Sequence, residues 1–108
     1  MTRYLIQFSP SVPGYGAVIK NPQDRAEATR PMFEALGGTL EVYYFAVGEN
    51  TVYLIGELPD EVSLEALLMV VMAGGAVTDQ RAVPILTAAE AVAAMEKAAE
   101  ASYRPPSA

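Results

Sequence analysis

Two carboxylates, Glu41 and Glu49, are the residues of this chain best suited by type to act as a general base. Both lie in the segment TLEVYYFAVGENTVYLIGE, which is otherwise rich in β-branched and aromatic residues. A carboxyl group held against apolar surface has a raised pKa and can accept a proton near neutral pH. In this hypothesis Tyr43, Tyr53 or Gln7 would polarise a substrate carbonyl. No catalytic constellation is specific enough to name a reaction.

The residue types that are missing narrow the chemistry. The chain has no histidine and no cysteine. This excludes a Ser-His-Asp triad, a thiolate nucleophile, and any metal or haem held by histidine or cysteine. We therefore expect no metal site and no cofactor. The glycines match no phosphate-binding loop.

The charge balance argues against polyanionic partners. The net charge is −6, and the seven basic residues are scattered along the chain. Such a surface repels phosphates, so we expect no nucleic-acid partner and no membrane partner. The start MTRYLIQFSP lacks a signal-peptide core, and the longest apolar run is too short to cross a bilayer. The expected location is cytoplasmic.

Hydrophobic patterning predicts four strands and three helices. The expected strands are Tyr4–Phe8, Thr39–Val47, Thr51–Leu58 and Val77–Leu86. The segment SPSVPGYGAV, with two prolines and two glycines, is predicted to be a loop. The helices are expected to start at Asn21-Pro22, at Asp60 and at the capping box Thr87–Glu90, and to end near Leu36, Met72 and Ala101.

The order β-α-β-β-α-β predicts an α+β, ferredoxin-like sandwich with an added C-terminal helix. We expect one domain over residues 1–101 and a disordered tail over residues 102–108. Two helices should cover one face of the sheet and leave the other face open. Lys20 and Arg25 flank a predicted helix start; we interpret them as solvated charges, with anion binding as the alternative.

Strand alternation predicts which side chains line the open face. In the second strand it places Thr39, Glu41, Tyr43 and Phe45 there, and Leu40, Val42, Tyr44 and Ala46 against the helices. Leu5 and Gln7 are expected on the open face, while the third strand is ambiguous. Such a face is too apolar for water, so a homodimer or higher homo-oligomer should cover it. The ligand-binding candidates are Gln7, Tyr43, Phe45, Tyr53 and Asn50.

The start YLIQFS, the segment IKNPQDRAEA before Leu36-Gly37-Gly38, the strand EVYYFAVGE and the turn ELPDE resemble the GYD-domain family. The resemblance covers about Tyr4 to Glu90. It implies a dimeric α/β-barrel, in which two open sheet faces pack together. The wider group contains cofactor-independent oxygenases, isomerases, haem enzymes and ligand-binding modules. After Gly48-Glu49 the family usually has Tyr-Asp, where this chain has Asn50-Thr51.

The segment Gly48-Glu49-Asn50 has two interpretations. Glycine and asparagine tolerate the positive φ of a tight hairpin turn, which explains the segment without any site. Alternatively, the turn places Glu49 at the mouth of a cavity. Three functions remain open: a homodimer that binds a small, largely apolar or aromatic ligand, a cofactor-independent isomerase or oxygenase acting on an aromatic or polyketide-like substrate, and a protein-interaction module.

Overall fold

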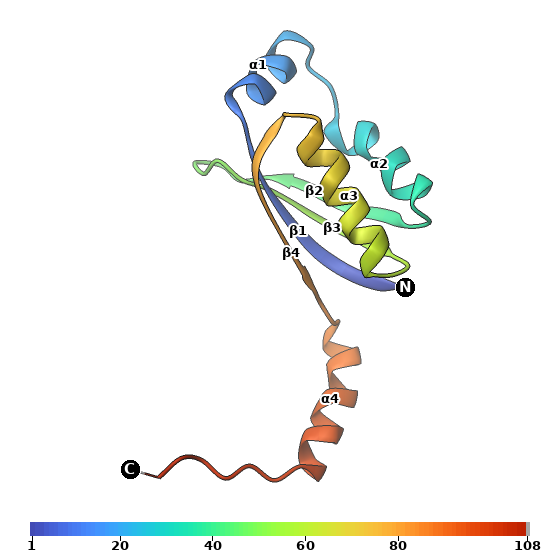
Figure 1. The fold of residues 1–108 in the computed structure, drawn as a ribbon, viewed down its shortest axis with the longest axis vertical. Helices are drawn as coiled ribbons and strands as arrows, with labels where there is room; N and C mark the ends of the chain where they lie inside the picture. The colour runs from blue at the N-terminus through green and yellow to red at the C-terminus, as the bar shows by residue number, and fades with distance from the viewer. Residues whose placement is uncertain (108) are drawn as a thin grey trace.

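Four antiparallel strands form one sheet in the order β2-β3-β1-β4, as the predicted ferredoxin-like α+β fold requires (Figure 1). The computed structural model describes residues 1–107. The elements are β1 (Thr2–Pro10), α1 (Val12–Lys20), α2 (Arg25–Ala35), β2 (Thr39–Phe45), β3 (Val52–Leu58), α3 (Glu61–Ala73), β4 (Val77–Pro84) and α4 (Ala88–Glu100). The helices α2 and α3 lie over one face of the sheet (Figure 1).

The core lies between this face and the two helices. Every second residue is buried along all of β3 and between Tyr4 and Phe8 of β1, as the pleat of a half-covered sheet dictates. Phe33 of α2 and Leu67 of α3 are fully buried against the sheet. The buried apolar residues are Tyr4, Ile6, Phe8, Phe33, Leu40, Val52, Leu54, Leu58 and Leu67. The ambiguity in the third strand is thereby resolved, because its even-numbered residues face the helices.

The segment predicted to be a loop, SPSVPGYGAV, is instead largely the helix α1, so this prediction was wrong. The Ser11 hydroxyl accepts a hydrogen bond from the Gly14 backbone N–H at 3.0 Å and caps the helix. Pro13 lies in the first turn, where a missing N–H leaves no bond unmade. Gly14 lies so close to the Ala76 carbonyl oxygen that a Cβ there would clash. These residues position a helix, although proline and glycine usually break one.

The predicted start of α2 was also wrong. Asn21 ends α1, and its backbone N–H donates to the Ala17 carbonyl at 3.0 Å. Asp24 caps α2 instead, because its carboxylate accepts the Ala26 N–H at 2.9 Å. The predicted end is confirmed: Gly37 has φ +82° just beyond the helix, where glycine is the favoured residue.

The remaining boundaries agree with the sequence predictions within a few residues. The Asp60 carboxylate accepts the Ser63 N–H at 2.8 Å and caps α3. Thr87 and Glu90 form the predicted capping box at the start of α4, with hydrogen bonds of 2.8 and 3.0 Å. Pro84 ends β4, which is an edge strand of the sheet.

The two acidic caps predict how stability depends on pH. Hydrogen bonds from the Ser63 and Thr87 backbone N–H groups lower the pKa of Asp60 and of Glu90, respectively. A carboxyl group whose pKa is lower in the folded state stabilises the fold above its unfolded pKa, and this stabilisation is lost as pH falls through its folded pKa. We therefore expect the thermal unfolding midpoint to decrease below about pH 4.

The matched variant is Asp60→Asn, which keeps a capping oxygen but does not titrate. Thermal unfolding followed by circular dichroism between pH 7 and pH 2 should show a shallower acid decline for the variant. If the unfolding midpoints of the two proteins fell in parallel over this range, protonation of Asp60 would not contribute to the acid decline.

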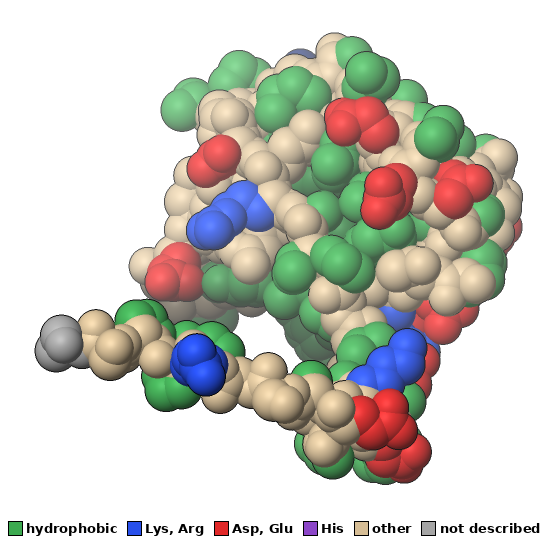
Figure 2. Space-filling view, turned by 60° about the horizontal axis from the view of Figure 1, so that its bottom comes forward, with side chains coloured by type: hydrophobic (Ala, Val, Ile, Leu, Met, Phe, Trp, Pro, Cys, Tyr) green, Lys and Arg blue, Asp and Glu red, His purple; other side chains and the backbone are tan. Residues whose placement is uncertain are grey.

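The helix α4 projects from the body and carries the C-terminal segment with it (Figure 1, Figure 2). No residue of α4 is buried, and within residues 1–107 its one ion pair to the body is from Glu90 to Arg3, at 3.7 Å. Residues 101–107 form neither helix nor strand. The division into a domain and a disordered tail stays a prediction. In the part of the chain that the structure describes, no helix has the length and apolar character of a membrane span.

Candidate functional site

A β-bulge in β2 changes which side chains face the helices. Leu40 pairs with Gly56 of β3, and Val42 pairs with the next β3 residue, Ile55. Glu41 is therefore the extra residue in β2. A bulge of this kind interrupts the alternation of side chains along its strand. Beyond Glu41, simple alternation therefore assigns the β2 side chains to the wrong faces of the sheet.

The bulge moves Tyr43 and Phe45 to the helix side of the sheet. Directly opposed residues of antiparallel strands share a face. Tyr43 is opposite Leu54 and Phe45 is opposite Val52, and both β3 residues are buried beneath the helices. The predicted placement of Tyr43 and Phe45 on the open face was wrong.

The same correction applies to the other set of β2 side chains. Val42 is opposite Ile55, and Tyr44 is opposite Tyr53, which places Val42 and Tyr44 on the open face. Leu40, before the bulge, faces the helices as predicted and is buried. The bulge residue Glu41 is opposite no residue of β3.

The open face of the sheet carries apolar residues at its centre. Leu5 of β1 pairs with Ile55 of β3, and Gln7 pairs with Tyr53. These four side chains are partly exposed, and no helix within residues 1–107 covers them. The prediction for Leu5 and Gln7 is confirmed. Two of the ligand-binding candidates, Gln7 and Tyr53, therefore lie side by side on this face.

Three carboxylates surround Arg3 at one end of this face. The guanidinium donates to Glu41 at 2.8 Å and to Glu57 at 3.1 Å, and it lies 3.7 Å from Glu90. The hydrogen bond to Glu41 is the main reason that the Arg3 pKa is raised above its ordinary value. The candidate base Glu41 is thus engaged in an ion pair.

The hairpin tip has the geometry of a turn. Gly48 has φ +88°, as the turn interpretation requires. The Glu49 side chain is exposed and makes no hydrogen bond within residues 1–107. Asn50 donates from its side-chain amide to the Pro10 carbonyl at 3.3 Å and so fixes the tip against the end of β1. No hydrogen bond within residues 1–107 joins Glu49 or Asn50 to Gln7 or Tyr53.

On the helix side, two adjacent cavities form a cleft between the helices and the sheet. One has a volume of about 170 Å³ and lies beneath α1; the other has about 350 Å³ and lies between α2 and α3. We call the two together the helix-side cleft. Both cavities are lined by Arg25, Tyr43, Ala76 and Val77. The cavity beneath α1 is also lined by Tyr15, Val18, Phe45 and Val52. The cavity between α2 and α3 is also lined by Met32, Val70 and Val71.

Arg25 and Tyr43 are the polar groups shared by both cavities. Burial raises the Tyr43 pKa, and the positive charge of Arg25 partly opposes this shift. The hydroxyl is therefore protonated near neutral pH and is able to donate a hydrogen bond. Arg25 donates to the Gln23 side-chain oxygen at 2.9 Å. Sequence reasoning did not assemble this cleft, because α1 was not expected and β2 was sorted to the wrong face.

Comparisons with known proteins identify the family. The family profile described as "GYD domain" matches residues 4–95. No curated protein gives a significant match. Protein Atu4242 from Agrobacterium tumefaciens, known from an X-ray crystal structure, is similar, with 12% identity and a TM-score of 0.47 over 82% of this chain and 94% of that one. A likeness at that level carries no argument about function. The match over most of the chain shows that this protein belongs to the GYD domain family.

Proposed function

We propose that this protein is a homodimer whose subunits pair through their open sheet faces and bind a small, largely apolar ligand between them. The observation that carries the proposal is the uncovered pair Leu5 and Ile55 at the centre of the sheet. Covering the apolar side chains of the two central strands with a second surface removes them from water, which lowers the free energy. A second copy supplies that surface by two-fold symmetry.

The polar residues on the same face support a ligand site inside this interface. Gln7 and Tyr53 adjoin the apolar pair and offer an amide and a hydroxyl group. A cavity of about 160 Å³ lies next to them and is lined by Gln7, Thr51, Asp79 and Arg81, among others. Buried polar groups need hydrogen-bond partners, which a ligand with one or two polar atoms would provide.

The test combines assembly and ligand content. Sedimentation of the wild-type protein at micromolar concentration should give a dimer or a larger oligomer. Native mass spectrometry of protein purified from its own host should show a bound small molecule at up to one copy per interface. A monomer in the first experiment would refute the dimer, and a dimer free of any ligand would refute the inter-sheet ligand site.

The isomerase or oxygenase alternative has less support from the geometry. Its candidate bases were Glu41 and Glu49. Glu41 is ion-paired with Arg3, and Glu49 is exposed at the hairpin tip. Neither carboxylate lines a cavity described above. We therefore propose ligand binding rather than catalysis.

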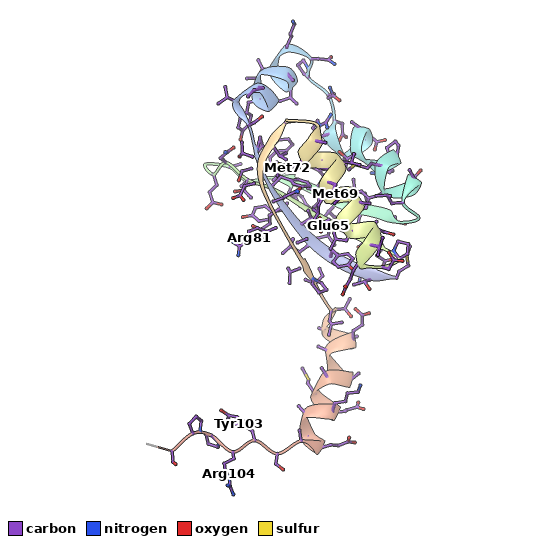
Figure 3. The ribbon with its side chains drawn as sticks, viewed as in Figure 1. Glu65, Met69, Met72, Arg81, Tyr103 and Arg104 are labelled. Carbon is purple, nitrogen blue, oxygen red and sulfur yellow. The ribbon has the colours of Figure 1, made fainter. Side chains whose placement is uncertain are left out.

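A second candidate is a protein-interaction module, and α4 is the observation that favours it. Met95 of α4 is 64% exposed, and no residue of the helix packs into the core. The helix α3 also exposes Met69 and Met72, which follow Glu65 along one side of the helix (Figure 3). Helices that expose apolar side chains in this way are docking elements in many complexes.

Hydrogen exchange tests whether α4 is free to bind a partner. In the homodimer alone the α4 amides should exchange rapidly. Protected α4 amides would mean that the second copy already holds the helix.

A further inference from the structure

The helix-side cleft has a charge opposite to that of the rest of the molecule. The chain carries 13 acidic and 7 basic residues. The described residues that line the two cavities nevertheless include no aspartate and no glutamate, and Arg25 is their one charged group. A cleft of this kind is electrostatically suited to an anion rather than to a cation.

Arg25 is also available to a ligand. Of the four ion pairs within residues 1–107, three involve Arg3 and one involves Arg30; none involves Arg25. Its side-chain hydrogen bond within residues 1–107 is to the neutral amide of Gln23, and its charge also acts on the Tyr43 hydroxyl. A partly buried guanidinium has five N–H donors and gains most from a carboxylate, which accepts two of them at once.

The apolar walls of the cleft restrict the remainder of the ligand. Phe45, Val52 and Val18 line the cavity beneath α1, while Val70, Val71 and Met32 line the cavity beside it. Such walls favour an alkyl or aryl group and offer it few polar partners. Tyr43 lines both cavities and, within residues 1–107, is the one side chain on their walls, besides Arg25, that both share and that can form a hydrogen bond.

We infer that the helix-side cleft binds a monoanionic amphiphile, with its carboxylate held by Arg25 and Tyr43 and its short alkyl or aryl tail between the helices and the sheet. The site lies within one subunit, on the opposite side of the sheet from the inter-subunit site proposed above. It therefore goes beyond the proposed function and does not depend on the dimer.

Octanoate is a suitable probe, and 1-octanol is its matched control because it has the same tail without the charge. Isothermal titration calorimetry on the wild-type protein should show saturable octanoate binding that is about 10- to 100-fold tighter than octanol binding, which is the range for a hydrogen bond to a charged group. Backbone amide shifts should change at Ala76 and Val77 and not at Gln7 and Tyr53.

Two substitutions separate the charge from general damage. Arg25→Gln should reduce octanoate affinity to that of octanol and leave octanol affinity unchanged. Lys20→Gln removes the same charge from an exposed residue of α1 that lines neither cavity, so it should leave both affinities unchanged. Tyr43→Phe keeps the ring and should weaken octanoate about three- to tenfold, as expected for the loss of one neutral hydrogen bond.

Several outcomes would overturn the inference: no saturable octanoate binding to the wild type, equal affinities for octanoate and octanol, or equal losses in Arg25→Gln and Lys20→Gln. The two proposals also fail separately. A monomeric variant such as Leu5→Asp should retain octanoate binding, and loss of binding together with the dimer would show that the cleft in one subunit is not a site. Circular dichroism of each variant checks that it is folded.

Discussion

Leu5→Asp is expected to convert the proposed homodimer into folded monomers. Leu5 lies on a central strand, opposite Ile55, on the face that no helix within residues 1–107 covers. In a dimer with two-fold symmetry each subunit would contribute one such aspartate to the interface. A desolvated carboxylate without a partner costs several kcal/mol, so we expect the dissociation constant to rise more than about 100-fold.

The matched control is Phe45→Asp, which makes a similar change on the other side of the sheet. Simple alternation in β2 would place Phe45 in the interface, whereas the pairing with Val52 places it on the helix side, where it is 51% exposed. Sedimentation over a range of concentrations should therefore show monomers for Leu5→Asp and an unchanged dimer for Phe45→Asp. The reverse pattern would mean that the helix side forms the interface.

Phe33→Ala is expected to lower the free energy of unfolding by about 3–5 kcal/mol, the usual cost of removing a buried aromatic ring. Phe33 is fully buried in α2 and packs directly over Gly56 of β3. A domain of this size is stable by about 5–15 kcal/mol, so the loss is a large share of the total. Urea unfolding at one fixed protein concentration measures it, because a dimer makes apparent stability depend on concentration.

A double-mutant cycle with Gly56→Ala shows whether this contact is the cause. A Cβ at Gly56 would lie 2.5 Å from the Phe33 ring and 2.9 Å from the Thr39 carbonyl oxygen. Gly56→Ala should therefore destabilise the wild type and cost less by about 1 kcal/mol when the ring is already absent, within the range of coupling between touching residues. The clash with Thr39 remains in both backgrounds. If the two substitutions destabilised the protein additively, the cost of Gly56→Ala would come from the contact with Thr39 alone.

Local sequence signals were sufficient wherever one element determines its own geometry. Asp60 and the Thr87–Glu90 pair cap their helices as predicted, and Gly37 ends α2 in the left-handed conformation. Each of these features depends on a hydrogen bond or a φ angle within four residues of the signal. The ferredoxin-like order followed from the same local signals, because the number and sequence of elements leave few topologies.

The composition alone determined part of the chemistry. With no histidine and no cysteine, the chain has no side chain whose ordinary pKa lies near neutrality and no thiolate. That limits its groups for acid–base work to carboxyl, tyrosine, lysine and arginine side chains. Composition does not show which of these side chains share a surface. In the structure Gln7 and Tyr53 are neighbours, whereas Tyr43 and Phe45 lie on the opposite face of the sheet.

Only the tertiary structure decided the two features that shape the helix-side cleft. The bulge at Glu41 exists because β2 pairs with β3 in a register that skips one residue, and a period-two pattern within β2 alone does not contain that information. The helix α1 forms over Ser11 and Gly14, whose contacts are with Gly75 and Ala76, far along the chain. Sequence determines local propensity, whereas close approach between distant segments decides which side of the sheet Tyr43 faces and what covers it.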